Sequence, residues 1–151
     1  MSDQETSQRA AVVAEARKWL KTPYHPMGDI KGAGVDCGML LVRVFVDTGL
    51  CVPFDPRPYA SDWMLHRSEE KYLGFIFDRT AEVSAPGLGD VMVFKFGRCY
   101  SHGGIVTSLK PLRIVHAFAP AGTVIEGDVA INQALNNPAR NPRFFSYWGC
   151  K

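Results

Sequence analysis

The sequence predicts a single α+β domain in which N-terminal helices pack on a central antiparallel β-sheet. Apolar residues in the first half of the chain recur at helical spacing, whereas those in the second half form short alternating runs separated by turn residues. Because the predicted helices come first and the strands follow, the strands are expected to pair with one another in an antiparallel sheet. The length of 151 residues fits one domain that covers residues 1–151.

The first helix is expected from Ser7 to Leu20, after a polar start to Thr6 that is expected to be frayed. The segment Thr22-Pro23-Tyr24-His25-Pro26 ends this helix, since proline and the residue before it disfavour helical backbone. A glycine-rich loop, Gly28 to Gly34, follows.

The second helix has Asp36 as its N-cap and Gly49 just after its end. Between them, residues at the i, i+3, i+4, i+7 spacing form one face: Cys37, Leu40, Leu41, Val44, Phe45 and Thr48. The segment Cys51–Pro58 contains three prolines and is expected to be irregular. A third helix is expected within Ser61–Phe77.

The second half of the chain is expected to supply the sheet. The predicted strands are Asp90–Phe96, Gly103–Leu109, Leu112–Phe118, Thr123–Glu126 and Phe144–Trp148. A short helix is expected over Asp128–Leu135, and a loop over Asn136–Pro142. This order places two strands, those before and after Lys110-Pro111, next to each other in the sheet.

Composition and charge exclude several classes of function. With 46% hydrophobic and 21% charged residues, the chain resembles an ordinary globular domain, and a formal charge of +2 provides no basic surface for nucleic acid. No apolar run is long enough to span a membrane, and the N-terminal residues lack the apolar core of a secretory signal. We therefore expect synthesis in the cytoplasm with reduced thiols, and, without a C-x-x-C pair, no structural zinc site.

Of the four cysteines, Cys37 has the position best suited to chemistry. It lies in the first turn of a helix, where the helix dipole stabilises a thiolate and free N–H groups can receive an oxyanion. The same position also fits an ordinary member of the apolar helix face. Cys51, Cys99 and Cys150 are interpreted as small buried or half-buried fillers.

Two of the four histidines fall on neighbouring predicted strands. His102 precedes two glycines that permit close approach of another element, such as the Cys37 helix, and His116 lies on the next strand. Adjacent antiparallel strands can place the two imidazoles side by side, so that one faces Cys37 and the other fixes its tautomer. Each histidine taken singly also fits a structural role. His25 is interpreted as part of a surface loop, and His66 as part of a solvated helix face.

Five short motifs occur in an order that resembles the NlpC family of bacterial and phage cell-wall cysteine peptidases. They are Thr22-Pro23-Tyr24, Val35-Asp36-Cys37-Gly38, Ala85-Pro86-Gly87-Leu88-Gly89-Asp90-Val91, Ser101-His102-Gly103-Gly104-Ile105 and Val115-His116-Ala117. The resemblance implies a papain-like fold with the nucleophilic cysteine at a helix N-terminus. It also implies that Cys37 is the nucleophile, His102 the general base and acid, and His116 the residue that orients His102.

The resemblance further implies substrate-binding or oxyanion-stabilising roles for four residues: Tyr24, Asp36, Gly38 and Ser101. Tyr24 also fits a packed loop aromatic, and capping alone also explains Asp36. Gly38 and Met39 depart from the family, which usually has serine and glycine there. In relatives that cut stem peptides, that serine helps to read a free L-alanine amine.

The function implied is hydrolysis of peptidoglycan stem peptides at a γ-D-glutamyl–diamino-acid bond, without cofactor or metal. A lone catalytic unit without a secretory signal resembles the phage-tail branch of the family, so tail proteins are expected partners and the virion or cell wall an expected location. Two alternatives remain: an acyltransferase or thioesterase of the same superfamily, and a catalytically silent tail-assembly protein. A metal site formed by Cys37, His102 and His116 is a more remote alternative.

Overall fold

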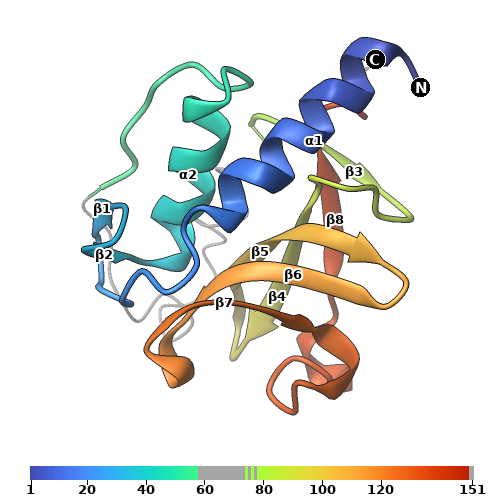
Figure 1. Cartoon of the computed structure of the whole chain (residues 1–151). Helices are drawn as coiled ribbons and strands as arrows, with labels where there is room; N and C mark the ends of the chain where they lie inside the picture. Colours follow the sequence, from blue (N-terminus) through green and yellow to red (C-terminus); the bar gives the residue numbers. More distant parts are fainter. Residues whose placement is uncertain (58–73, 75, 77, 150–151) are drawn as a thin grey trace.

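Helix α1 (Asp3–Arg17) opens the fold and lies across one side of the sheet (Figure 1). The computed structural model describes residues 1–57, 74, 76 and 78–149. The helix begins four residues earlier than predicted because the Ser2 side chain accepts a hydrogen bond from the Glu5 N–H and caps it. The segment expected to be frayed therefore forms the first turn of α1. Its inner face buries Val12, Val13 and Ala16.

A small hairpin lies in the region predicted as a glycine-rich loop. Strands β1 (Asp29–Ile30) and β2 (Gly34–Val35) pair antiparallel, and Tyr24 forms a parallel bridge with Val35. A Cβ atom on Gly28 would lie 2.7 Å from the carbonyl oxygen of Gly34, so a side chain there would push the two segments apart. The hairpin leads directly into the second helix.

Helix α2 (Cys37–Asp47) confirms the prediction for the second helix. Asp36 caps it, with Oδ1 accepting from the Met39 N–H at 2.9 Å, and Gly49 follows its end with φ +81°. The buried side chains of α2 are Met39, Leu40, Leu41, Val42, Val44 and Phe45. Burial of each large apolar side chain contributes about 1.5–3 kcal/mol, which holds this helix against the sheet.

Six strands form one antiparallel sheet with the order β3-β8-β4-β5-β6-β7 among the described residues. Their bounds are β3 (Ala81–Val83), β4 (Val91–Phe96), β5 (Cys99–Leu109), β6 (Leu112–Phe118), β7 (Thr123–Asp128) and β8 (Arg143–Ser146). The sequence predicts five of these approximately and misses β3, a short edge strand that pairs only with β8. The α+β fold class is confirmed.

Strand β5 starts four residues before its predicted start. Cys99 pairs with Phe96 and Tyr100 with Lys95, so the segment before His102 continues the hairpin with β4. The register shifts between Phe94 and Lys95, because Phe94 pairs with His102 and Ser101 has no partner of its own. Ser101 is therefore a β-bulge immediately before His102.

The helix expected over Asp128–Leu135 is wrong. Only a single 3-10 turn, η3 (Val129–Ile131), forms there. The Asn132 side chain accepts hydrogen bonds from the N–H groups of Ala134 and Leu135, at 3.0 and 3.2 Å. This local side-chain to backbone bonding competes with helix propagation and turns the chain instead.

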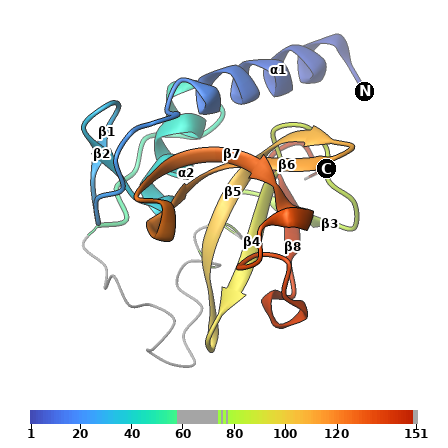
Figure 2. The same cartoon turned by 60° about the horizontal axis from the view of Figure 1, so that its bottom comes forward.

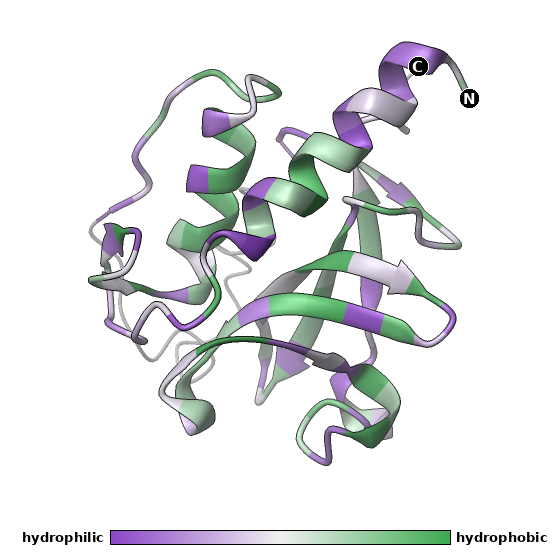
Figure 3. Ribbon diagram, viewed as in Figure 1, coloured by the Kyte–Doolittle hydropathy of each residue, from purple (hydrophilic) through white to green (hydrophobic). Residues whose placement is uncertain are grey.

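Two apolar clusters cover the two faces of the sheet. The cluster under α1 and α2 includes Val93, Ile105 and Phe145, and the other includes Phe94 and Ile114. Figure 2 shows α1 along one side of the curved sheet and the segment before β8 on the other. Figure 3 shows that hydrophobic residues dominate α2 and alternate with polar ones along the strands, as this two-sided packing requires.

The third helix expected within Ser61–Phe77 lies outside the described residues, apart from positions 74 and 76. Within the described ranges, no helix combines the length and apolar character needed to cross a membrane.

Candidate active site

The thiol of Cys37 lies where the start of α2 meets strand β5. Its Sγ donates to the carbonyl oxygen of Ser101 at 3.5 Å, and the side chain is half-buried. That carbonyl belongs to the bulge residue, so the irregularity in β5 brings the thiol next to the residue that precedes His102. The first turn of α2 and the bulge in β5 therefore form one corner of the site.

The two histidines form a hydrogen-bonded pair. His102 Nε2 lies 2.8 Å from His116 Nδ1, and the ring centroids are 5.0 Å apart. The expectation that neighbouring strands place these imidazoles side by side is confirmed. Since Nε2 of His102 is used in this bond, Nδ1 is the ring nitrogen left to exchange a proton with a reacting group.

Gly104 is the residue that lets the histidines meet. A Cβ atom at this position would lie 2.9 Å from the His116 Cβ and 2.9 Å from the Val115 carbonyl oxygen. We expected the glycines after His102 to admit the Cys37 helix. At Gly104 the neighbour that needs the space is instead His116, because β6 packs against β5 there.

Aromatic rings enclose His102. The ring centroids of Phe94, Phe96 and Phe118 lie 5.9, 5.8 and 5.7 Å from that of His102, and Phe118 also lies 4.9 Å from His116. Burial among these rings, together with the neighbouring imidazole, holds the pKa of His102 well below its usual value. Burial also lowers the pKa of His116 to about 4. Both imidazoles are therefore neutral at pH 7.

Burial has the opposite consequence for the thiol. It raises the pKa of Cys37 to about 12, and the negative charge of Asp36 contributes in the same direction. Backbone N–H groups of Gly103, Gly38 and Cys37 itself lower this pKa, as expected at a helix start, but they do not outweigh burial. The raised pKa favours the neutral thiol at rest, in contrast to the thiolate that the position at the helix start predicts.

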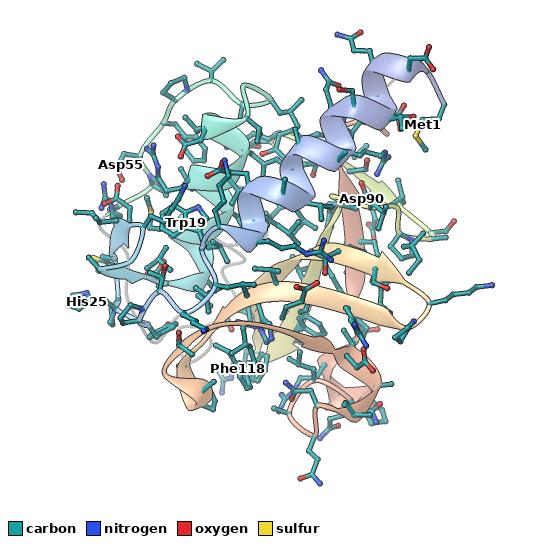
Figure 4. All side chains as sticks on the ribbon, in the orientation of Figure 1. Met1, Trp19, His25, Asp55, Asp90 and Phe118 are labelled. Carbon is teal, nitrogen blue, oxygen red and sulfur yellow. The ribbon has the colours of Figure 1, made fainter. Side chains whose placement is uncertain are left out.

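A pocket of about 330 Å³ opens over Cys37 and His102. The other described residues that line it are Tyr24, Pro26, Asp36, Gly38, Phe96, Ser101, Ala117, Phe118, Ala119, Pro120 and Ala134. The pocket therefore collects six of the seven site residues predicted from sequence, while His116 lies behind His102. Phe118 ends β6 and pairs with Thr123 at the start of β7, and Figure 4 shows it next to the β7 ribbon.

The four predicted binding residues have distinct positions. Tyr24 is half-buried at the pocket wall, and burial together with the nearby Cys37 and Asp36 raises the pKa of its hydroxyl. Asp36 is buried, and its Oδ2 accepts from the Met27 N–H at 2.7 Å while Oδ1 caps α2. Gly38 and Ser101 present backbone groups to the sulfur.

Sequence reasoning missed the aromatic and proline residues of the pocket. Phe118 follows His116 by two positions on one strand, so period-two alternation places both side chains on one face and could have indicated it. Phe96 and Pro120 reach the pocket through a hairpin end and the turn η2 (Ala119–Ala121), which no sequence period reports.

The remaining sequence motifs have structural roles. Thr22 Oγ1 accepts from the Gly32 N–H, which holds the β1–β2 hairpin, and Asp90 accepts from the Gly87 N–H and from Arg9. His25 is exposed, as predicted, and Figure 4 shows it at the outer edge of the molecule beside the hairpin. His66 lies outside the described residues.

Three cysteines are described, and none of Cys37, Cys51 and Cys99 forms a disulfide. Cys150 lies outside the described residues. Over the described ranges, no group of three or more His, Cys, Asp and Glu side chains is arranged to hold a metal ion.

Comparison with solved structures identifies the fold. The chain superimposes on the NlpC/p60 domain of the peptidoglycan hydrolase SagA with a TM-score of 0.59, 23% identity, and coverage of 91% of this chain and 96% of that one. A crystal structure of an N-acetylmuramoyl-L-alanine amidase from Bacteroides uniformis gives a TM-score of 0.58 at 14% identity, covering 92% and 98%. No family model and no curated protein sequence matches the chain.

These similarities define the class of fold to which the chain belongs: it has the α+β fold of an NlpC/p60 domain over nearly its whole length. The positions reported above place a cysteine at a helix start and His102 in one pocket, and His116 on the adjoining strand is hydrogen-bonded to His102.

Proposed function

We propose that this protein is a cysteine hydrolase that cleaves amide bonds in peptidoglycan stem peptides. The observation that carries the proposal is the pocket that Cys37 and His102 both line, with His102 hydrogen-bonded at 2.8 Å to His116. A nucleophile, a base and a residue that orients the base are what thiol-based acyl transfer requires. The substrate class is supported by the sequence motifs and by the peptidoglycan hydrolase and amidase that share the fold.

In the proposed first step, Sγ of Cys37 attacks the amide carbonyl carbon while the thiol proton moves to Nδ1 of His102. The resting groups are both neutral, so proton transfer accompanies attack. The carbonyl oxygen becomes an oxyanion. Asp36 already occupies the N–H groups of Met39 and Leu40, which leaves those of Cys37 and Gly38 at the helix start to stabilise it.

In the second step, His102 returns the proton to the leaving nitrogen, the C–N bond breaks and a thioester on Cys37 remains. Water then attacks the thioester carbonyl, giving its proton to His102, and the carboxylic acid product and the free thiol are released. His116 accepts the Nε2–H of His102 throughout, which keeps Nδ1 directed at the reacting atoms and stabilises the imidazolium that forms.

The bond proposed for cleavage is the γ-D-glutamyl–diamino-acid bond, from the motif resemblance. Gly38 has no side-chain hydroxyl, and both oxygens of Asp36 accept backbone hydrogen bonds. We therefore propose that this chain does not read a free L-alanine amine through residue 38. Association with a phage tail is also proposed from the resemblance, and immunoblotting of purified virions for this chain tests it.

The test of the proposed function is mass spectrometry of defined muropeptides incubated with wild type and Cys37→Ala. Loss of the nucleophile lowers the rate on the order of a million-fold, so no product is expected from the variant. Cys51→Ala and Cys99→Ala are matched controls, because both remove a thiol that does not line the pocket. Cleavage that persists in Cys37→Ala would contradict the proposal.

A thioesterase or acyltransferase is the second candidate, and the apolar character of the pocket favours it. Phe96, Phe118 and Pro120 line the space beside the thiol. Burst release measured in parallel on muropeptides and on acyl thioesters separates the two functions, since the preferred substrate acylates Cys37 faster.

A further inference from the structure

The pocket over Cys37 has a wall of apolar side chains on the side away from α2. Phe96 comes from the end of β4, Phe118 from the end of β6, Pro120 from η2, and Ala134 from the turn after η3. Four separate segments therefore converge on one apolar surface next to the reacting groups. An apolar cavity of about 150 Å³ accepts benzene, so about 330 Å³ has room for a ring or branched side chain beside the bond that reacts.

The described residues that line this pocket include one carboxylate, that of Asp36, and no lysine or arginine side chain. Arg140 stacks on Phe96, 3.9 Å from the ring centroid, but its Nε and Nη1 donate to the carbonyl oxygens of Ala134 and Lys95. The guanidinium is thus tied to the backbone and supports the wall.

A carboxylate placed in this pocket would lose hydration without gaining a cationic partner, and it would face the charge of Asp36. An apolar group would lose only unfavourable contact with water. Both effects favour binding of an apolar group over a carboxylate in this pocket.

From this geometry we propose that the surface formed by Phe96, Phe118, Pro120 and Ala134 is a subsite for an uncharged, apolar substrate group next to the bond attacked by Cys37. The subsite excludes carboxylates. This inference rests on the proposed function and restricts the substrates of the enzyme. A stem-peptide carboxylate must be amidated or must lie outside the pocket. Side chains of alanine type or larger apolar groups are accepted.

Alkylation of Cys37 by three related reagents tests the subsite without requiring catalysis. Iodoacetamide is neutral and small, iodoacetate is its anionic counterpart, and N-phenyl iodoacetamide adds an aromatic ring. In each case the sulfur displaces iodide from the CH₂ carbon and the thiol proton is lost to a base. Alkylation rates at Cys37 are followed by peptide mass spectrometry. Each rate is divided by the rate of the same reagent with N-acetylcysteine amide, which corrects for the different intrinsic reactivities of the three reagents.

For wild type, the normalised rate with N-phenyl iodoacetamide is expected to exceed that with iodoacetamide about tenfold, because the ring is partly buried. The normalised rate with iodoacetate is expected to be about tenfold lower than with iodoacetamide. Phe96→Ala should remove most of the aromatic preference. Normalised rates that are equal for all three reagents in wild type would overturn the subsite.

A pair of lysine variants tests the charge preference. Ala119 and Ala121 are both exposed in the turn η2, but only Ala119 lines the pocket. Ala119→Lys should raise the normalised iodoacetate rate at Cys37 about threefold or more, by placing a cation at the rim. Ala121→Lys should leave it unchanged. Equal iodoacetate rates in the two variants would contradict the proposed charge selection.

The two proposals fail in different ways. If muropeptides are not cleaved but the reagent preference is observed, the proposed function is wrong and the subsite stands. If muropeptides are cleaved by wild type and not by Cys37→Ala, while the reagents show no preference, the function stands and the subsite is wrong.

Discussion

At His102 the two ring nitrogens have different surroundings. Nε2 is bound to His116, and the ring is enclosed by Phe94, Phe96 and Phe118, so the pKa of His102 is held well below its usual value. The imidazole of His102 is therefore neutral at pH 7, and it gains a proton less readily than an exposed histidine does. The hydrogen bond to His116 then matters most when His102 becomes charged.

Replacement of His116 tests the role of this hydrogen bond. His116→Ala should lower kcat/KM by on the order of 10³-fold or more, because the acceptor that orients His102 and stabilises its cation is lost. His116→Asn should recover part of this loss, since its Oδ1 can occupy the position of Nδ1 and accept the same hydrogen bond. The measurement is muropeptide hydrolysis by the two variants, with thermal unfolding as a check on folding.

The pH dependence of kcat/KM distinguishes an orienting role of His116 from a purely structural role. In wild type the acid limb of kcat/KM should lie below pH 6.5, since burial depresses the pKa of His102. His116→Asn should move that limb, because the neighbouring imidazole is one cause of the depressed pKa. An acid limb above pH 7 in wild type, or an unmoved limb in the variant, would contradict this role for His116.

Among the elements, strands β5 and β6 approach each other closely at Gly104. Gly104 allows β6 to approach so closely that a Cβ atom would meet the His116 Cβ at 2.9 Å and Ile114 Cδ1 at 3.0 Å. On the same strand, the bulge at Ser101 directs a carbonyl oxygen to the Cys37 thiol. A glycine and a bulge in one strand thus set the positions of all three proposed catalytic side chains.

Gly104→Ala tests whether this close approach of β5 and β6 is required. The added methyl group meets backbone and side chain that cannot both move, so unfolding should become easier by about 1–3 kcal/mol. Muropeptide hydrolysis should fall more than stability alone explains, because the histidine pair is displaced. Denaturant unfolding and hydrolysis rates measure the two effects.

Gly127→Ala provides the matched control on β7. A Cβ atom there has no other atom within 4 Å, so a much smaller change in stability and activity is expected. If Gly104→Ala were as stable and as active as Gly127→Ala, the close approach of β6 would not be what positions His116.

For the whole molecule, a partly buried ion pair joins the two halves of the chain in addition to the core. Arg9 of α1 donates to Asp90 at 2.9 Å and to the Leu88 carbonyl oxygen at 2.8 Å, just before β4 begins. Asp90 also accepts from Gly87. The family-like motif around Asp90 therefore holds α1 on the sheet.

Stability should depend on pH through the buried histidines. The pKa of His116 is about 4 in the folded protein, against 6.5 for an ordinary histidine, so the unfolded chain binds more protons between these values. The free energy of unfolding should therefore fall as the pH drops from 6.5 toward 4, by on the order of 3 kcal/mol. Urea unfolding at a series of pH values measures it.

His116→Asn should flatten this slope between pH 4.5 and 6.5. Carboxylates whose pKa is lowered by ion pairs, such as Glu126 with Arg17 and Glu82 with Arg143, affect stability only below about pH 4.5, where they begin to protonate in the unfolded chain. A slope that is unchanged in the variant would show that His116 is not its source.

The fold class, helix α2 and the pairing of the two histidine strands can all be predicted from the amino-acid sequence. These features depend on local signals: an N-cap at Asp36, apolar spacing from Leu40 to Phe45, and period-two alternation around His116. The ordered motifs predict seven site residues. Six of them line the pocket, and the seventh, His116, lies behind His102. Element ends were less well predicted, since Ser2 and Asn132 act through side-chain to backbone bonds that compete with simple periodicity.

The electrostatics and the shape of the site, by contrast, result from the packing of distant segments. The sign of the Cys37 pKa shift depends on burial by β5 and on the charge of Asp36, which outweigh the helix start that the sequence reveals. The need for Gly104 depends on where β6 packs, and the apolar wall joins Phe96, Phe118 and Ala134 from distant segments. Burial and contact between distant segments are properties of the folded chain, so no local pattern of residues reports them.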